Sequence, residues 1–275
     1  MIPSKTVRRT ATAAMVFLTG GVCVLLAHDM FLKPADFFVQ PNSTLLVRLL
    51  NGNFSNSENS ITRDRLADIS MVSPQGRERI DTSRWTVAGD TSTVTIRTGL
   101  EGTYLLGVST RPNIIALEAK DFNEYLETDG MPDVLEARRR DNELDRAVRE
   151  RYAKHVKTLV QVGDARTAAF ATELGYPAEI VPVENPYLLR PGSRMHVRVL
   201  FQGRPIANQF IQYGGRTPTG DRIAMRSVRS NAEGVATIPL EAGAWYIKFI
   251  HQARRDADPD ADYESTWASL SFAIR

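Results

Sequence analysis

The stretch Thr93-Val-Thr-Ile-Arg97 alternates polar and apolar residues with a period of two. A strand with one face on a core and the other in water has this period. Similar runs, rich in β-branched and aromatic residues, surround it: Phe37–Gln40, Thr44–Leu50, Ile69–Val72 and Tyr104–Ser109. Clusters of Gly, Pro, Asn and Ser separate these runs, and the loop at residues 51–60 is typical of an exposed turn region. The first part of the chain is therefore predicted to be a β-sheet domain.

The C-terminal part shows the same pattern again. Predicted strands there are Thr158–Val162, Ala178–Pro182, Met195–Phe201, Gln209–Tyr213, Ile223–Ser227, Val235–Pro239, Trp245–Ile250 and Ala268–Ile274. Turn-forming residues separate them, for example Arg190-Pro-Gly192 and Asn231-Ala-Glu-Gly234. Short strands at this spacing are typical of a β-sandwich.

Between the two strand-rich parts the period changes. Leu117, Phe122, Tyr125 and Leu126 recur at helical spacing, and a charge-dense stretch follows at residues 133–151. We expect two or three amphipathic helices between residues 113 and 157, the last of them carrying His155. The mixed charges at residues 138–141 are predicted to form a solvated helix face rather than a docking surface.

These patterns predict a mainly β protein with two sandwich domains, immunoglobulin-like or transthyretin-like. The expected organisation is a signal peptide at 1–27, an N-terminal β-sandwich at 28–112, a helical connector at 113–162 and a C-terminal β-sandwich at 163–275. The length of 275 residues is sufficient for two modest hydrophobic cores.

The N-terminus resembles a secretory signal. Lys5, Arg8 and Arg9 form a basic region, an apolar stretch follows at residues 11–26, and Ala27 is a small residue suited to cleavage. We expect a periplasmic protein; an uncleaved membrane anchor is the alternative, although the apolar stretch is shorter than the ~20 residues of a span. Cys23, the single cysteine, lies inside this segment, so the mature chain is predicted to contain no disulfide and no thiolate metal site.

The charge balance argues against nucleic acid as a partner. The whole chain has 34 basic and 32 acidic residues. Three of the basic residues belong to the predicted signal peptide, so the mature chain would be nearly neutral, without the basic stripe that a phosphate backbone requires.

The chain contains several distinctive motifs: His28-Asp-Met-Phe-Leu-Lys-Pro34, Phe122-Asn-Glu-Tyr-Leu126, Arg149-Glu-Arg-Tyr152, Ala178-Glu-Ile-Val-Pro182, Asn185-Pro-Tyr187, Gly203-Arg-Pro205, Gly243-Ala-Trp245 and Tyr263–Phe272. Together they resemble a bacterial periplasmic family of unknown function that is often labelled NikM-like, for nickel or cobalt uptake. The resemblance covers essentially the whole mature chain and implies metal handling in the envelope. Uptake components of that kind carry membrane-spanning helices, whereas this sequence shows no spanning stretch after residue 27. It is therefore expected to be a soluble accessory protein whose partner is a membrane metal transporter or another envelope protein.

His28 is the strongest candidate for a metal ligand. Cleavage after Ala27 would make it the first residue, and its α-amine and imidazole could then chelate one Ni, Co, Cu or Zn ion. His251, at the end of a predicted strand, is the candidate second imidazole. Asp262 is the candidate oxygen ligand, with Asp29 and Glu264 as alternatives. In the other interpretation His28 is simply a polar residue at a tethered N-terminus.

The remaining candidates are weaker. His155 is expected to be solvated, and His196 to point outward from its strand. The acidic run Asp256–Asp262 lacks the glycine and glutamate spacing of an EF-hand, so a mobile loop is preferred to a calcium site. No P-loop, dinucleotide-binding or nucleophile-elbow motif is present, and we expect no enzyme. Trp245 and Trp267 are expected in the core, and Trp85 is expected to be partly exposed.

Two functions therefore remain open on the sequence. The first is a periplasmic metal-binding accessory protein. The second is a non-catalytic module that docks on a protein or polysaccharide partner of the envelope. Sandwich folds host many functions, so architecture alone does not choose between them.

Overall fold

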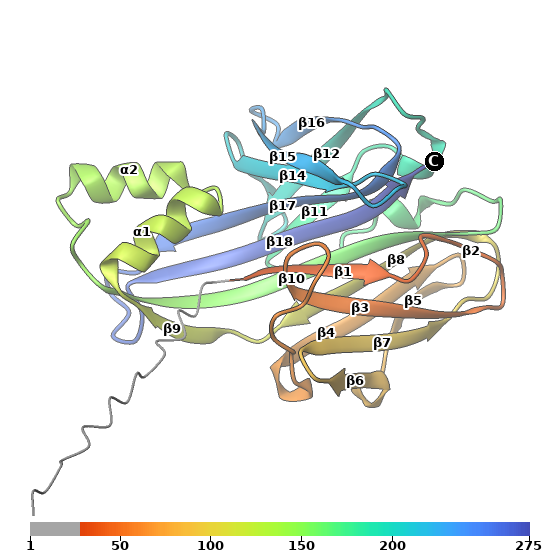
Figure 1. Cartoon of the computed structure of the whole chain (residues 1–275), viewed down its shortest axis with the longest axis horizontal. Coiled ribbons are helices and arrows are strands. Elements are labelled where there is room, and N and C mark those ends of the chain that lie inside the picture. Colours follow the sequence, from red (N-terminus) through yellow and green to blue (C-terminus); the bar gives the residue numbers. More distant parts are fainter. Residues whose placement is uncertain (1–27) are drawn as a thin grey trace, which may run out of the picture.

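A computed structural model describes residues 28–275. The predicted signal peptide and Cys23 lie outside the described residues. Three β-sheets are stacked, with two helices beside one end of the longest strands (Figure 1). The prediction of a mainly β protein is confirmed.

The central sheet has ten strands and forms the middle layer. Its main path runs through β15 (Arg222–Arg229), β14 (Phe210–Arg216), β17 (Gly243–Arg254), β18 (Tyr263–Ile274), β10 (Val148–Val162), β8 (Gly102–Thr110), β4 (Leu66–Ser73) and β5 (Gly76–Arg79). Two short strands, β2 (Phe38–Val39) and β9 (Asn113–Leu117), also pair with β10. The β10 and β18 pair is parallel, whereas the other neighbours on the main path are antiparallel.

Two four-stranded sheets cover opposite faces of the central sheet. One contains β1 (Asp29–Pro34), β3 (Thr44–Gly52), β7 (Thr91–Arg97) and β6 (Trp85–Ala88) in that order. The other contains β11 (Ala178–Pro182), β12 (Arg194–Phe201), β13 (Arg204–Pro205) and β16 (Val235–Pro239). Single turns of 3₁₀ helix occur at Arg63–Arg65, Thr82–Arg84, Ala168–Ala171 and Pro186–Leu188.

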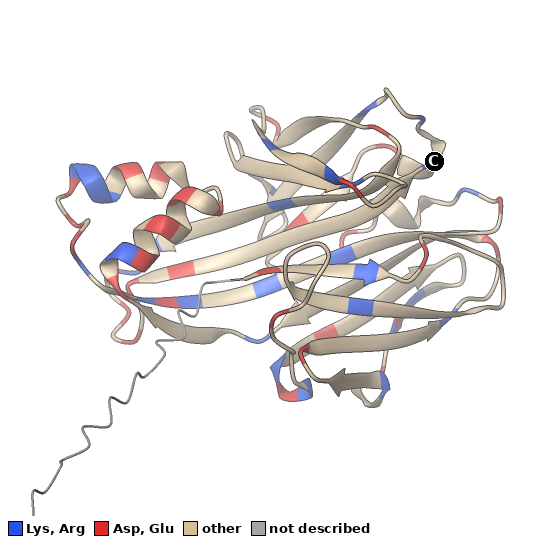
Figure 2. Cartoon of the chain, viewed as in Figure 1, with Lys and Arg blue, Asp and Glu red and all other residues tan. Residues whose placement is uncertain are grey.

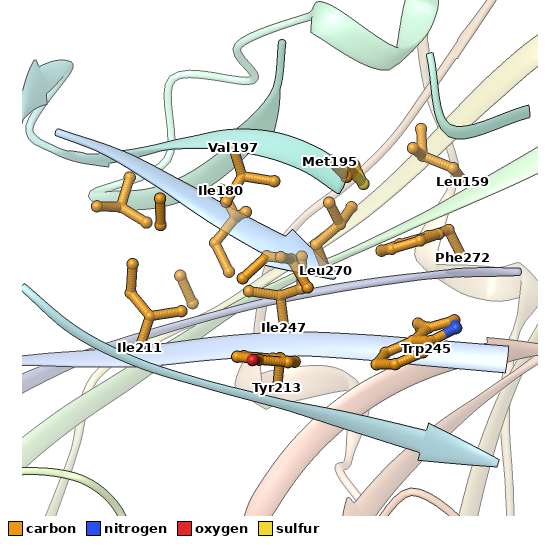
Figure 3. Close-up of a cluster of buried hydrophobic side chains, with 14 of the residues drawn as sticks. Leu159, Ile180, Met195, Val197, Ile211, Tyr213, Trp245, Ile247, Leu270 and Phe272 are labelled. Carbon is orange, nitrogen blue, oxygen red and sulfur yellow. The ribbon is translucent and has the colours of Figure 1, made fainter. Parts of the chain in front are cut away.

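Alternating side chains of the central strands supply two separate cores. Tyr104 and Leu106 of β8 face the sheet of β1, whereas Leu105 between them faces the sheet of β11. Figure 3 shows the second core, with Trp245, Ile247, Leu270 and Phe272 packed against Ile180, Met195 and Val197. The central sheet is therefore shared by two sandwiches, and it runs across the predicted domain boundaries at 112/113 and 162/163.

The helical segment is shorter than predicted. It consists of α1 (Ala119–Thr128) and α2 (Pro132–Arg140), whose buried faces pack on Trp267 and Tyr263 of β18. The prediction that residues 148–157 form the last helix is wrong, because they form the first two thirds of strand β10. The side chains of Glu150, Lys154 and Lys157 are buried there, so this part of the charge-dense segment belongs to an interior strand. In the predicted solvated helix face at residues 138–141, Arg139, Arg140 and Asp141 are exposed at the end of α2, whereas Arg138 is buried.

Candidate functional site

A cavity with mixed polar and apolar walls lies where the described chain begins. It has a volume of about 190 Å³. Its walls carry the basic side chains His28, Arg65 and Lys154, the neutral polar residues Asn51, Asn59, Ser60, Thr110 and Tyr152, and the apolar residues Met30, Ile61 and Ile115. We call it the N-terminal cavity. No Asp or Glu is among the described residues that line it.

Strand β1 positions the first wall of this cavity. It pairs with β3, which sets Met30 opposite Asn51, and the Ser269 hydroxyl of the central sheet donates a hydrogen bond of 2.7 Å to the Met30 carbonyl oxygen. Because side chains alternate along a strand, His28 and Met30 face the cavity together, whereas Asp29 faces the other side. The two side chains of the His-x-Met sequence therefore lie on the same face of the strand.

The imidazole of His28 stands beside a carboxylate. Its Nδ1 atom is 3.4 Å from Oε2 of Glu58, and 21% of the His28 side chain is exposed. Glu58 comes from the loop after β3, whose backbone folds back so that the Glu58 amide donates to the Asn51 carbonyl oxygen at 2.9 Å. The polar loop at residues 51–60 therefore has a definite role, since it brings an acidic group to the edge of the cavity.

Lys154 forms the buried end of the cavity. Its ammonium donates to the carbonyl oxygen of His28 and lies 4.6 Å from the centre of the Trp267 ring. The side chain is 5% exposed. Burial lowers the pKa of Lys154 to about 8, and the nearby carboxylates of Asp29, Asp129 and Glu150 limit that fall. Lys154 thereby fixes the backbone at the first described residue.

A second charged group occupies the other side of β1. The Lys248 ammonium contacts the carboxylates of Asp29 at 2.5 Å and Asp129 at 2.9 Å. Asp129 is placed there because α1 ends at Thr128 and Gly130, at φ +85°, turns the chain away. Burial raises the pKa of Asp129, an effect that the Lys248 ammonium opposes. Burial alone would lower the pKa of Lys248, but the two carboxylates raise it above its ordinary value.

Glu150 is a further buried acid on the same face of the central sheet. It accepts hydrogen bonds from the Tyr125 hydroxyl at 3.0 Å, from Gln252 Nε2 at 2.8 Å and from the Ser265 hydroxyl. Burial raises its pKa. Figure 2 shows that charged positions continue from the helices onto the neighbouring central strands. The end of the sheet under α1 is therefore polar and ionic as well as apolar.

The structure does not bring the predicted metal ligands together. The ring of His251 packs on Phe201 at 4.0 Å between centroids, and burial lowers its pKa. Thr266 of β18 pairs with His251, whereas Trp267, which contacts Lys154, pairs with Ile250. His251 therefore lies on the opposite face of the central sheet from the N-terminal cavity, because neighbouring positions of a strand face opposite sides.

Asp262 is also engaged elsewhere. Its carboxylate accepts hydrogen bonds from Arg146 at 3.0 Å and from the backbone amide of Arg149 at 2.8 Å. Asp258 and Asp256, in the same acidic run, pair with Arg151 and Arg254. Within residues 28–275, no group of three or more His, Cys, Asp or Glu side chains is arranged to hold a metal ion. A three-side-chain site made of His28, His251 and Asp262 is thus not formed.

Three smaller expectations meet different outcomes. The prediction that His155 is solvated is wrong, because His155 is only 3% exposed and its Nδ1 lies 2.9 Å from the Ser109 hydroxyl. The prediction that Trp85 is partly exposed is also wrong, since Trp85 is fully buried and its Nε1 donates to the Ile61 carbonyl oxygen at 2.8 Å. The predicted core positions of Trp245 and Trp267 are confirmed.

Sequence reasoning missed most of the residues that surround His28. Lys154, Arg65 and Glu58 come from β10, from the turn before β4 and from the loop after β3. No alternation of polar and apolar residues marks this part of β10, since residues 149–152 and Lys154 are all polar. Charged side chains are ordinarily exposed, so the burial of Glu150 and Lys154 was not predictable from the pattern.

Three stacked sheets, with ionic groups on both sides of the first strand, define this molecule as a β-rich protein with a small cavity of mixed polar and apolar lining at its N-terminal strand. The chain belongs to the family described as Domain of unknown function (DUF4198), whose model matches residues 25–253. Among the described residues, no helix combines the length and apolar character that crossing a bilayer requires.

Comparison with other proteins adds little. No curated protein matches the chain significantly. The chain is similar to trypsin-activated alpha-2-macroglobulin from Escherichia coli, with 8% identity, a TM-score of 0.22 and coverage of 91% of this chain and 16% of that one. It is also similar to the tetra-tandem repeat in the extending region of a large adhesion protein, with 10% identity, a TM-score of 0.22 and coverage of 90% of this chain and 49% of that one. For the Escherichia coli adhesin FdeC the identity is 12%, the TM-score is 0.23, and the match covers 90% of this chain and 64% of that one. The chain spans less than two thirds of each, and these scores are too low to transfer a fold or a function.

Proposed function

We propose that this protein is an exported, non-catalytic binding protein of the bacterial envelope that holds one transition-metal ion at His28. The observation that carries the proposal is the pairing of the His28 imidazole with the Glu58 carboxylate at the edge of the N-terminal cavity. The resemblance to nickel- and cobalt-uptake components supports the same class of ligand. A membrane metal transporter is the partner that such an accessory protein would serve.

The spacing of the two groups suits a metal ion. In protein sites, imidazole nitrogen and carboxylate oxygen lie about 2.0–2.2 Å from a zinc-sized ion. Two ligand atoms at that distance and 3.4 Å apart subtend roughly 110° at the ion, which is close to a tetrahedral angle. His28 Nδ1 and Glu58 Oε2 therefore need little movement to share one ion.

Two further ligands are available in the same place. Export with cleavage after Ala27 would free the His28 α-amine, which forms a chelate with the imidazole of the same residue. Met30 lines the same cavity and carries a thioether, a soft ligand that copper accepts and that magnesium and calcium do not. This donor set favours Cu, Ni, Co or Zn over the hard cations.

The test compares metal affinities of four forms of the protein. They are the chain starting at His28, the same chain with one extra N-terminal alanine, the Glu58→Gln variant and, as a matched control, Glu233→Gln on an exposed turn. Calorimetric titration with Cu(II) and Ni(II) should show weaker binding for the extended chain and for Glu58→Gln, by roughly 10–100-fold, and no change for Glu233→Gln. Equal affinity in all four forms would overturn the metal proposal in favour of the interaction-module alternative.

A further inference from the structure

We infer that the N-terminal cavity also binds a small oxyanion, a carboxylate or a phosphate, between Arg65 and Lys154. The charges of its walls lead to this inference. Arg65 and Lys154 both line the cavity, and no acidic side chain is among its described lining residues. The described walls carry no carboxylate to balance these two groups, so the inner end of the cavity favours an anion, whereas the metal ion proposed above lies at its edge, between His28 and Glu58.

Arg65 is held in place with a donor to spare. One of its terminal nitrogens donates to the Arg111 carbonyl oxygen at 3.1 Å, and its guanidinium lies 5.7 Å from the centre of the Tyr152 ring. Its Nε atom is buried and has no hydrogen-bond partner among residues 28–275. A buried N–H without a partner is unfavourable, and an oxyanion that reaches this atom from the cavity would satisfy it.

Lys154 supplies the second positive charge of the proposed anion site. Its ammonium carries three donors; one donates to the His28 carbonyl oxygen and a second to the Asn51 side-chain oxygen at 3.5 Å, which leaves one for a ligand. The group is nine-tenths or more buried, so water screens its charge weakly. Asn51 and Asn59 line the same space and can donate through their side-chain amide nitrogens.

The size of the cavity restricts the ligand. Its volume of about 190 Å³ is smaller than the ~300–1,000 Å³ of sites for drug-sized molecules. A guanidinium suits a planar or tetrahedral oxyanion because it donates two parallel hydrogen bonds. These features favour inorganic phosphate or a small carboxylate such as oxalate over a larger organic anion.

The anion site uses groups other than the proposed metal ligands, so it can be tested in metal-free protein. The chain starting at His28 is stripped with a chelator, dialysed, and titrated in a calorimeter with sodium phosphate and with sodium oxalate at constant ionic strength, with chloride as the blank. We expect saturable binding of at least one of the two anions. The Arg65→Gln variant should bind it roughly 10–100-fold more weakly, the loss expected for a charge-assisted hydrogen bond.

Controls separate this site from general electrostatics and from the metal site. Arg84→Gln removes an exposed guanidinium outside the cavity and should leave anion affinity unchanged. Arg65→Lys keeps the positive charge but lacks the planar guanidinium, so its anion affinity should lie between those of wild type and Arg65→Gln. It replaces Arg65→Gln in the test if that variant does not fold. Glu58→Gln should retain anion binding even where it loses metal. Absence of saturable binding of both anions, or equal affinity of wild type and Arg65→Gln, would overturn the inference.

Discussion

The Lys248 ammonium lies 2.5 Å from the Asp29 carboxylate, joining residues 219 positions apart in the sequence. Lys248 is in the middle of β17, and Asp29 begins β1. The contact fixes the start of the N-terminal strand to the central sheet. It also brings His28, the preceding residue, to the edge of the N-terminal cavity.

Replacing Lys248 should be strongly destabilising. Lys248→Met removes the cation that both carboxylates contact and leaves Asp29 and Asp129 as unpaired, partly buried charges, each with about a fifth of its side chain exposed. We expect a loss of about 3–5 kcal/mol in the free energy of unfolding, measured by urea denaturation. Arg226→Met is the control: Arg226 pairs with Glu241 at 3.9 Å in an exposed position, and the expected loss is about 0–1 kcal/mol. Similar losses in both variants would contradict the anchoring role of Lys248.

His155 should make the protein sensitive to mild acid. Burial lowers its pKa to about 4 from an ordinary value of 6.5. Between these values the unfolded chain binds more protons than the folded one, so the free energy of unfolding falls as the pH drops from 6.5 to 4. The expected contribution is about 3 kcal/mol. Urea denaturation of wild type and His155→Leu across this range measures it, and the variant should lose less stability than wild type. Parallel pH profiles would show that His155 does not carry this dependence.

Lys154 should have an effect at alkaline pH. Burial lowers its pKa to about 8 from 10.5, so the unfolded chain binds the extra proton between these values. The free energy of unfolding therefore rises with pH from 8 to 10.5, relative to a chain without this group. Denaturation of wild type and Lys154→Met at several pH values tests this. The difference in stability should move in favour of wild type by about 3 kcal/mol across the range. A constant difference would rule out a depressed pKa.

The two members of the buried ion pair between Lys157 and Glu179 should not be equivalent. The Glu179 carboxylate accepts a hydrogen bond from the Lys157 ammonium at 2.9 Å. It also accepts hydrogen bonds from the backbone amides of Leu174, Gly175 and Tyr176. Glu179→Gln leaves the buried ammonium unpaired and loses amide acceptors, so we expect it to cost about 3–5 kcal/mol. Lys157→Met leaves a carboxylate that three amides still satisfy, and it should cost less. Chemical denaturation of both variants decides the order, and the reverse order would contradict this account.

The strands with alternating or continuous apolar residues were predictable from the sequence. Ala178–Pro182 and Val235–Pro239 coincide with β11 and β16, and Thr93–Arg97 lies within β7. β10 was predicted only in part: Thr158–Val162 lies within it, whereas its first half carries charged residues and was assigned to a helix. Its buried charges are stable only because distant groups partner them, such as Glu179 for Lys157. A local pattern contains no information about such partners.

The candidate site divides in the same way. His28 could be singled out from the sequence because it follows a cleavable-looking segment and because histidine is scarce in this chain. Its neighbours could not, since Glu58 and Lys154 reach it through the fold of a loop and the packing of β1 on the central sheet. The suggested pairing with His251 fails for a geometric reason, because the central sheet separates the two imidazoles.

By itself, the sequence determined that this protein is mainly β and which runs of residues have a face to bury, because the period of apolar residues reports burial on one side of a strand. Only the tertiary structure decided that the two sandwiches share a central sheet, and which charges meet around the first strand. Those arrangements depend on contacts between residues a hundred or more positions apart, and such contacts are set by packing and electrostatics in three dimensions rather than by local order along the chain.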